Sequence, residues 1–252
     1  MAGAELDAAA TLVVVPARRA STRLPDKLLL AESGKPLLAH TLEACLGAAE
    51  ADAVVAAVDD PELAAAAEAA GVPAVLTDPA LPSGSDRVWA VVQELPQVEV
   101  VVNVQGDEPE MDPAAIDALI RAVRDGAPAA TLAAPLAPEA WEDPAAVKVV
   151  SDLAGRALYF SRAPIPFRRD GAGVEPRLHL GVYAFRREVL GAFAAADPTP
   201  LERTERLEQL RLLEHGVELA VLPWERSFPG IDTRRDYDGF LTRRRRRPSP
   251  PS

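Results

Sequence analysis

The first half of the chain alternates short apolar runs with longer segments of helical periodicity, and this alternation limits the possible folds more than any other feature. The most apolar run, at residues 98–104, contains five valines. Apolar strands separated by helices are typical of a parallel sheet that helices cover on both faces. The strands are predicted at 12–15, 53–58, 74–76 and 98–104, and the helices at 36–48, 61–70, 85–94 and 113–124.

The second half has a different pattern, because most of its strand-like runs are not separated by long helices. We predict that a nucleotide-binding half, 11–128, is followed by a mixed half, 129–242, that completes the sheet and holds a second ligand. Together they form one domain, 11–242, between a flexible N-terminus, 1–10, and a disordered Arg/Pro/Ser tail, 243–252. The strands of the second half are predicted at 131–134, 147–151, 157–160, 178–186 and 218–222, and its helices at 188–195, 201–215 and from about 233.

Composition excludes several classes of protein. Apolar residues make up 48% and charged residues 26%, as in a globular domain with a core. The longest uncharged run, 126–138, has 13 residues, whereas a membrane-spanning helix needs roughly 18. The net charge of −11 argues against non-specific nucleic-acid binding, and the single cysteine excludes a disulfide scaffold or a thiolate metal cluster. Without a secretory signal at the N-terminus, we predict a cytoplasmic protein with no membrane or nucleic-acid partner.

A basic loop follows the first predicted strand. Residues 16–27, PARRASTRLPDK, combine Arg18, Arg19, Arg23 and Lys27 with small, turn-forming residues. Backbone N–H groups of such a loop can surround a polyphosphate, an Arg can bind two of its oxygens, and a Lys can act as a point charge. Ligands of parallel sheets bind beyond the carboxyl ends of the strands. The acidity of the chain favours this function over the alternative, a solvated basic loop.

A second candidate segment, 82–92, follows the third predicted strand. Ser83 or Ser85 can cap the next helix, and Gly84 allows a ligand to approach the backbone closely. Arg87 lies in the first helical turn, where the helix dipole disfavours a cation. Its position therefore requires an anionic partner, which is either a ligand or the acidic half of a structural salt bridge.

Two aspartates are candidates for a metal site. Asp107 follows the most apolar strand, in VQGDEP, and Asp232 precedes the last predicted helix, in GIDT. Mg²⁺ is held by one or two carboxylates together with phosphate oxygens and water, so these two residues suffice. The alternatives are a turn-capping role for Asp107 and a helix N-cap role for Asp232.

Three segments of the second half, YFSR, HLGVY and LEQLR, mix apolar and polar side chains. Arg162 ends the first of them, and His179 and Tyr183 share one face of a predicted strand. Glu208 and Gln209 belong to the third. The alternative is that the strand residues are structural and that Glu208 and Gln209 are exposed on a helix surface.

These segments occur in the order found in the 3-deoxy-manno-octulosonate (Kdo) cytidylyltransferases, or CMP-Kdo synthetases, a family that the chain resembles from about Leu12 to Tyr237. The resemblance rests on PARRASTRLPDK, SGSDR, VNVQGDEP, AVKVV, ALYFSRAPIP, HLGVYAF, LEQLRLLEHG and GIDT. It implies a Rossmann-like nucleotidyltransferase fold, α/β, with a mixed and mostly parallel sheet, helices on both faces and a small mixed subregion. It also implies a homodimer whose second half binds the sugar and dimerises.

The resemblance further implies the reaction of CTP with Kdo to give CMP-Kdo and pyrophosphate, with Mg²⁺, for lipopolysaccharide biosynthesis. Arg18, Lys27, Asp107 and Asp232 would be catalytic, with Mg²⁺ on the two aspartates. CTP would contact Pro16, Ala17, Arg18, Ser21, Thr22, Lys27, Ser83, Gly84, Arg87, Gln105 and Asp107. Kdo would contact Gln105, Arg162, His179, Tyr183, Glu208 and Gln209, and Arg162 is the expected partner of its carboxylate.

The chain departs from the family pattern in places. The family usually has Gly where this chain has Asp26, and a carboxylate there could attract Lys27 or narrow the loop. The arm between Pro166 and Pro176 matches little. A same-fold enzyme for 8-amino-Kdo or a sialate-like acid is the alternative within the fold, and a non-catalytic nucleotide-binding protein is the alternative of another class. The presence of both aspartates argues against the latter.

Overall fold

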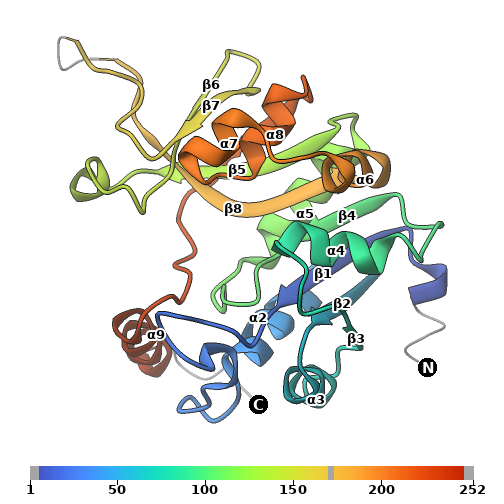
Figure 1. The fold of residues 1–252 in the computed structure, drawn as a ribbon. Helices are drawn as coiled ribbons and strands as arrows, with labels where there is room; N and C mark the ends of the chain where they lie inside the picture. The colour runs from blue at the N-terminus through green and yellow to red at the C-terminus, as the bar shows by residue number, and fades with distance from the viewer. Residues whose placement is uncertain (1–5, 170–172, 247–252) are drawn as a thin grey trace.

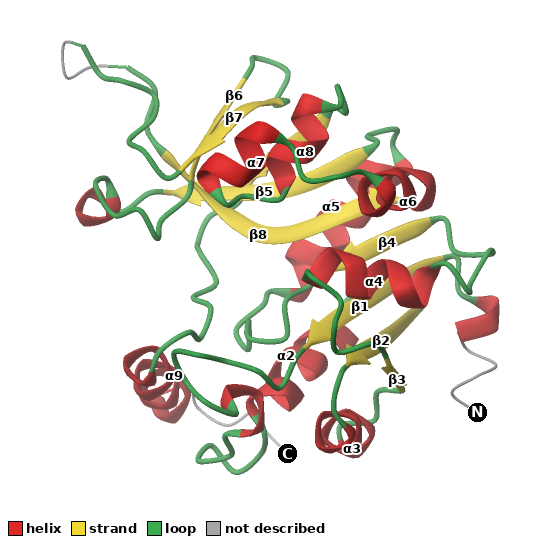
Figure 2. Ribbon diagram, viewed as in Figure 1, coloured by secondary structure: helices red, strands yellow, loops and turns green. Residues whose placement is uncertain are grey.

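A nine-stranded sheet runs through the computed structural model, which describes residues 6–169 and 173–246 (Figures 1 and 2). Its strand order is β3-β2-β1-β4-β8-β5-β9, and β6 and β7 extend it from β8. The strands are β1 (Thr11–Ala17), β2 (Ala53–Val58), β3 (Ala74–Leu76), β4 (Val100–Asn103), β5 (Ala129–Pro135), β6 (Lys148–Ser151), β7 (Ala157–Ser161), β8 (Arg177–Arg186) and β9 (Leu219–Pro223). The helices are η1 (Lys27–Leu29), α2 (Leu37–Leu46), α3 (Pro61–Ala69), α4 (Gly84–Val92), α5 (Pro113–Arg124), η2 (Pro138–Ala140), α6 (Arg187–Ala195), α7 (Pro200–Glu205), α8 (Gln209–Glu214) and α9 (Arg234–Arg246).

Strand direction confirms the predicted α/β fold with a mostly parallel sheet. β1 pairs in parallel with β2 and β4, β2 with β3, and β5 with β9. β8 lies antiparallel between β4 and β5, so that Val102 pairs with Ala184, and β7 lies antiparallel to β6. β7 and β8 therefore run against the other strands, and the pairing of β8 joins the two halves of the chain into one sheet.

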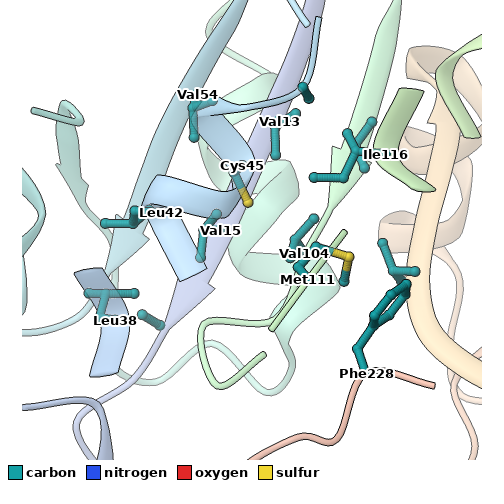
Figure 3. Packing of buried hydrophobic residues seen from close by; sticks show 14 of the residues in the cluster. Val13, Val15, Leu38, Leu42, Cys45, Val54, Val104, Met111, Ile116 and Phe228 are labelled. Atoms are coloured by element: carbon teal, nitrogen blue, oxygen red, sulfur yellow. The ribbon is translucent and has the colours of Figure 1, made fainter. Parts of the chain in front are cut away.

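Two apolar clusters fill the space between the sheet and its helices. Side chains along β1 alternate between them, because successive strand residues point to opposite faces. Val13 and Val15 belong to the first cluster, part of which Figure 3 shows, and Leu12 and Val14 belong to the second. The first cluster includes residues of α2, α3, α5 and α9, and the second includes residues of α4, α6 and α8. The central strand is thus buried on both faces, which explains why its sequence is uniformly apolar.

Short side chains fix the start of three helices. Asp60 and Asp112 each accept a hydrogen bond from the backbone N–H two residues later, at the N-caps of α3 and α5. Pro61 and Pro113 follow them, where a missing N–H costs nothing. Ser83 caps α4 and accepts from the N–H of the third residue after it. These caps fix where α3, α4 and α5 begin after the chain has left the carboxyl ends of the parallel strands.

The predicted helix 201–215 is wrong as a single element, because the structure divides it into α7 and α8. Arg206 adopts the left-handed conformation, with φ of 56°, and its N–H donates to the carbonyl of Glu202 at 2.7 Å. The turn folds α8 back so that the Arg211 guanidinium reaches the Glu202 carboxylate in two bonds of 2.8 and 2.5 Å. Apolar periodicity alone does not reveal this break.

Both predicted chain ends differ from the structure where they are described. Residues 6–8 are helical, Ala9 is buried, and the Gln97 amide donates to the Leu6 carbonyl at 2.8 Å, so this part of the predicted flexible N-terminus packs on the domain. α9 continues to Arg246, and Arg243 pairs with Glu110 at 2.6 Å, so the predicted boundary of the tail at 243 is wrong. The remainder of both predictions, residues 1–5 and 247–252, lies outside the described residues.

The Glu202–Arg211 pair yields a stability prediction. Both side chains are at most one-tenth exposed, so removing the guanidinium strands a buried carboxylate. We expect Arg211→Met to lower the free energy of unfolding by about 3–5 kcal/mol. Chemical denaturation measures the loss. Arg203→Ala, an exposed control on α7, should change the stability by about 0.5 kcal/mol or less.

The double variant Glu202→Gln with Arg211→Met separates the ion pair from local packing. Since it removes both charges, it should be more stable than Arg211→Met alone. Equal stability of the two variants would contradict a role for the buried charge.

Candidate active site

Two adjoining cavities lie beyond the carboxyl end of the central strand β1, at the point where the strand order reverses. Their volumes are about 480 and 190 Å³. They share a wall made by the residues that leave β1 and by one residue after β4: Pro16, Ala17, Arg18 and Gln105. This is the location at which open α/β sheets bind ligands.

The predicted site residues gather in these cavities, with the single exception of Arg162. The larger cavity brings residues predicted for the base together with residues predicted for the sugar: Ser83, Gly84, Arg87, Gln105, His179, Tyr183, Glu208 and Gln209. The smaller cavity contains the residues predicted for the triphosphate and the metal: Ser21, Thr22, Lys27, Asp107 and Asp232. Residues distant in sequence, such as Lys27 and Asp232 at a separation of 205 residues, therefore line one continuous site.

The two predicted metal carboxylates meet at a lysine. The ammonium Nζ of Lys27 lies 2.5 Å from Oδ2 of Asp107 and 3.0 Å from Oδ1 of Asp232. The other oxygen of Asp232 lies 2.9 Å from the Arg23 guanidinium. The N–H of Ile231 donates to the Asp107 carbonyl at 2.9 Å, which holds the two acidic segments together. The basic loop and both aspartates thus form one network of charges.

The loop is anchored on its outer side by Arg19. The Arg19 guanidinium pairs with Asp26, Asp60 and Glu62 at 3.0–3.1 Å, and the backbone N–H of Arg19 donates to the Asp59 carboxylate at 2.8 Å. Asp26 adopts the left-handed conformation, with φ of 50°. Asp tolerates this conformation better than most residues, which explains how it stands where the family usually has Gly. The Asp26 carboxylate pairs with Arg19 and leaves Lys27 to the two site aspartates.

The nucleotide side of the larger cavity is closely packed. A Cβ atom on Gly84 would lie 3.2 Å from the amide nitrogen of Gln105 and 3.5 Å from Cγ of Pro16. The Gln105 amide in turn donates to Oδ1 of Asn103 at 3.2 Å. Asn103 is almost fully buried and also lines the cavity, although nothing in its sequence pattern marks it as a site residue. Gly84 therefore lets the oriented amide of Gln105 pack closely against the start of α4.

Arg87 has its anionic partner within the protein. Its side chain is 3% exposed, lies 3.6 Å from the Asp59 carboxylate, and donates to Oγ1 of Thr77. The structural salt bridge, one of the two possibilities drawn from the sequence, is therefore present. Arg87 remains part of the cavity wall, so its predicted contact with CTP stays a prediction.

His179 is held neutral on the sugar side. Burial lowers its pKa to about 3. Its Nε2 lies 3.0 Å from Oγ1 of Thr131, whose hydroxyl donates to the carbonyl of Val182 at 2.8 Å. Because that hydroxyl hydrogen is already used, the histidine must supply the hydrogen of the Nε2 contact, which leaves Nδ1 as an acceptor. Tyr183 lies beside it with ring centroids 5.4 Å apart, and burial keeps its phenol protonated by raising its pKa.

Glu208 and Gln209 line the cavity and are not surface residues. Oε2 of Glu208 accepts a hydrogen bond from the Ser85 hydroxyl at 3.0 Å, which links α4 to the start of α8. Burial raises the pKa of this carboxyl above its ordinary value. Gln209 is 5% exposed, and its Nε2 is buried with no hydrogen-bond partner among the described residues. The pair offers one acceptor and one donor to a ligand.

Arg162 does not line either cavity, so its predicted contact with Kdo stays a prediction without support from the cavity walls. Its guanidinium donates to the carbonyls of Glu205 and Pro144, both at 2.8 Å, and to that of Arg206 at 3.4 Å. The carbonyl of Arg162 accepts from the fully buried ammonium of Lys148. Arg162 therefore stabilises the turn between α7 and α8 from outside the cavity.

Arg206 occupies the cavity wall instead. The residue is exposed, and its guanidinium makes no ion pair within the described parts of the chain. Sequence reasoning missed it because residues 201–215 were expected to form one helix, in which Arg206 has no special place. The left-handed turn is the feature that brings it to the cavity.

Comparisons with known proteins show the family to which the chain belongs. A family model described as cytidylyltransferase matches residues 12–219. The chain is 50% identical over 228 residues to the 3-deoxy-manno-octulosonate cytidylyltransferase of an Anaeromyxobacter species (strain Fw109-5), covering 90% of this chain and 93% of the relative. It is 44% identical over 243 residues to that of Rhodopirellula baltica, covering 92% and 97%.

A solved structure agrees as well. It is that of a CMP:2-keto-3-deoxy-manno-octonic acid synthetase complexed with CTP, which superimposes with a TM-score of 0.90 at 35% identity and covers 93% of this chain and 98% of its own. Since both sequence and fold match over nearly the full length of these proteins, the chain belongs to the 3-deoxy-manno-octulosonate cytidylyltransferase family.

Proposed function

We propose that the protein transfers the cytidylyl group of CTP to Kdo and releases pyrophosphate. The observation that carries the proposal is the joining of two cavities at one shared wall, Pro16 to Arg18 and Gln105. A nucleotide whose base lies in the larger cavity would extend its phosphates into the smaller one. The α-phosphate would then lie at the shared wall, beside the residues that face the sugar.

The reaction requires little covalent chemistry from the protein. The anomeric hydroxyl of Kdo attacks the α-phosphorus, a new O–P bond forms, the bond to pyrophosphate breaks, and the hydroxyl proton passes to water. Such displacements are accelerated by positioning and by neutralising charge. Arg18 and Lys27 supply positive charge in the basic loop, while Nδ1 of His179 and the Gln209 amide offer an acceptor and a donor for sugar hydroxyls.

Magnesium fits the donor set of the smaller cavity. The carboxylates of Asp107 and Asp232 both lie within hydrogen-bonding distance of one cationic atom, Nζ of Lys27, so they converge on a single position. Two carboxylates, completed by phosphate oxygens and water, are a usual ligand set for Mg²⁺. When bound, the metal would neutralise charge that develops on the phosphate oxygens.

The setting of the reaction is also a proposal. We infer that CMP-Kdo serves lipopolysaccharide biosynthesis in the cytoplasm. Within the described residues, none of the helices combines the length and apolar character needed to cross a membrane.

A homodimer is supported by apolar side chains exposed around β7 and the arm that follows it: Leu153, Leu158, Phe167 and Val174. Sedimentation equilibrium would reject the dimer if it returned the mass of a single chain.

Pyrophosphate release tests the proposed activity. The purified protein is mixed with CTP, Mg²⁺ and one acceptor at a time: Kdo, 8-amino-Kdo or a sialic acid. We expect release with Kdo, weaker release with 8-amino-Kdo, and none with sialic acid or without an acceptor. Preference for either of the other acids would replace Kdo as substrate, and absence of release with every acid would reject the enzyme function.

The metal ligands give a second prediction. Asp107→Asn and Asp232→Asn each remove a charged ligand from a site with few protein ligands, so we expect either change to abolish most turnover at limiting Mg²⁺. Asp125→Asn, an exposed control of the same chemistry, should retain full turnover. Near-normal turnover of either site variant would show that the metal assignment is wrong.

The sugar side gives a third prediction, which concerns Arg206 and Arg162. We propose that Arg206, on the wall of the larger cavity, binds the Kdo carboxylate by a charge-assisted bond, so Arg206→Ala should raise KM for Kdo on the order of 10- to 100-fold. KM for CTP and the melting temperature should change little. Arg162→Ala should instead lower the melting temperature and impair both substrates, because its guanidinium holds three backbone carbonyls. Equal effects of the two changes would contradict the separation of roles.

A further inference from the structure

The position of Lys27 carries a further inference. Its side chain is only 13% exposed, and its ammonium donates to Asp107 at 2.5 Å and to Asp232 at 3.0 Å. It therefore lies at the point on which the two carboxylates converge. A cation that uses Oδ2 of Asp107 and Oδ1 of Asp232 together must come to that same point.

Charge is already balanced in this arrangement. Two carboxylates face two cations of the basic loop, Lys27 and Arg23, the latter at 2.9 Å from Asp232. A divalent ion would add two positive charges beside Lys27 and Arg23, which already neutralise these two carboxylates. At separations of a few ångströms, repulsion between like charges is substantial, so the ammonium and the metal exclude each other.

Distances lead to the same exclusion. Mg²⁺ requires its oxygen ligands at about 2.0–2.1 Å, with nearly octahedral geometry. The ammonium, at 2.5 Å from Oδ2 of Asp107 and 3.0 Å from Oδ1 of Asp232, already occupies lone pairs of the two oxygens that point to a common position. The Lys27 backbone is fixed in η1, next to the buried side chain of Leu28, so the flexible side chain of Lys27 is the part that can move away.

We propose that Lys27 is the resident counter-ion of Asp107 and Asp232, and that a divalent metal binds the pair only by displacing its ammonium. The proposal rests on the proposed function in taking the two aspartates as metal ligands. Ser21, Thr22 and Arg18 line the same cavity, so the displaced ammonium stays beside the surface expected to hold the triphosphate. Metal alone would bind weakly, and a triphosphate would strengthen metal binding by accepting the released lysine.

Mn²⁺ binding without nucleotide tests the displacement. Free Mn²⁺ is followed by electron paramagnetic resonance while the full-length protein is added. We expect Lys27→Met to bind Mn²⁺ on the order of 10- to 100-fold more tightly than the unchanged protein, because the competing charge-assisted bonds are gone. Lys27→Arg keeps the positive charge, so its Mn²⁺ binding should remain weak. Lys35→Met removes a lysine paired with Glu43 elsewhere and should match the unchanged protein.

Thermal melting provides an independent measurement. Without metal, Lys27→Met should melt at a lower temperature, because two neighbouring carboxylates lose a shared cation. Mn²⁺ should raise the melting temperature of this variant more than that of the unchanged protein. In the double variant Lys27→Met with Asp107→Asn, Mn²⁺ should raise the melting temperature much less than in Lys27→Met. Lys27→Gln repeats the set, should the methionine variant fold poorly.

The outcomes separate this proposal from the proposed function. If Lys27→Met and Lys27→Gln bind Mn²⁺ no more tightly than the unchanged protein, while Asp107→Asn weakens binding of Mn²⁺ with CTP, the counter-ion role is overturned and the metal assignment stands. If Lys27→Met gains Mn²⁺ affinity but the unchanged protein releases no pyrophosphate from CTP with any acid, the counter-ion role stands and the enzymatic function is rejected.

Discussion

The antiparallel insertion of β8 between β4 and β5 is the constraint on which the site depends. It pairs Asn103 at the end of β4 with Tyr183, so the first residues of β8 lie at the edge where the parallel strands end. The pairing of β8 with β5 is irregular beside Thr131, and that hydroxyl fixes the ring of His179. Residues of the nucleotide half and of the sugar half share a cavity because this one strand belongs to both. Without β8, the larger cavity would lack its wall on the sugar side.

Much of the fold and most of the site could be predicted, because buried strands and ordered motifs are local signals. Strands such as β1 are apolar on both faces, and the aspartate after β4 follows directly from its place at a strand end. The sequence could not reveal that Arg162 points to backbone carbonyls, nor that Arg206 replaces it in the cavity wall. Both depend on a left-handed turn within a stretch of continuous helical periodicity. The partner of Arg87 was also hidden, because Asp59 is distant in sequence.

Because the chain is acidic, anion binding depends on which of its cationic side chains are already paired with carboxylates. Arg19 is committed to three carboxylates that anchor the loop, and Arg87 is committed to Asp59. Lys148 is buried against three backbone carbonyls and has no part in either cavity. Arg18 and Arg206 remain on the cavity walls without an ion pair in the described residues, and Lys27 is held by Asp107 and Asp232.

Because of the left-handed turn at Arg206, the side chain at this position of the cavity wall can change with little effect on the stability of the protein. Its backbone is fixed by the carbonyl of Glu202 and by the guanidinium of Arg162, and its side chain packs into neither helix core. A positive φ is more comfortable for asparagine or glycine than for arginine, so replacements here need not unfold anything. This is a position at which natural variation could change the preferred sugar acid by single substitutions, while selection for stability acts on the residues behind it.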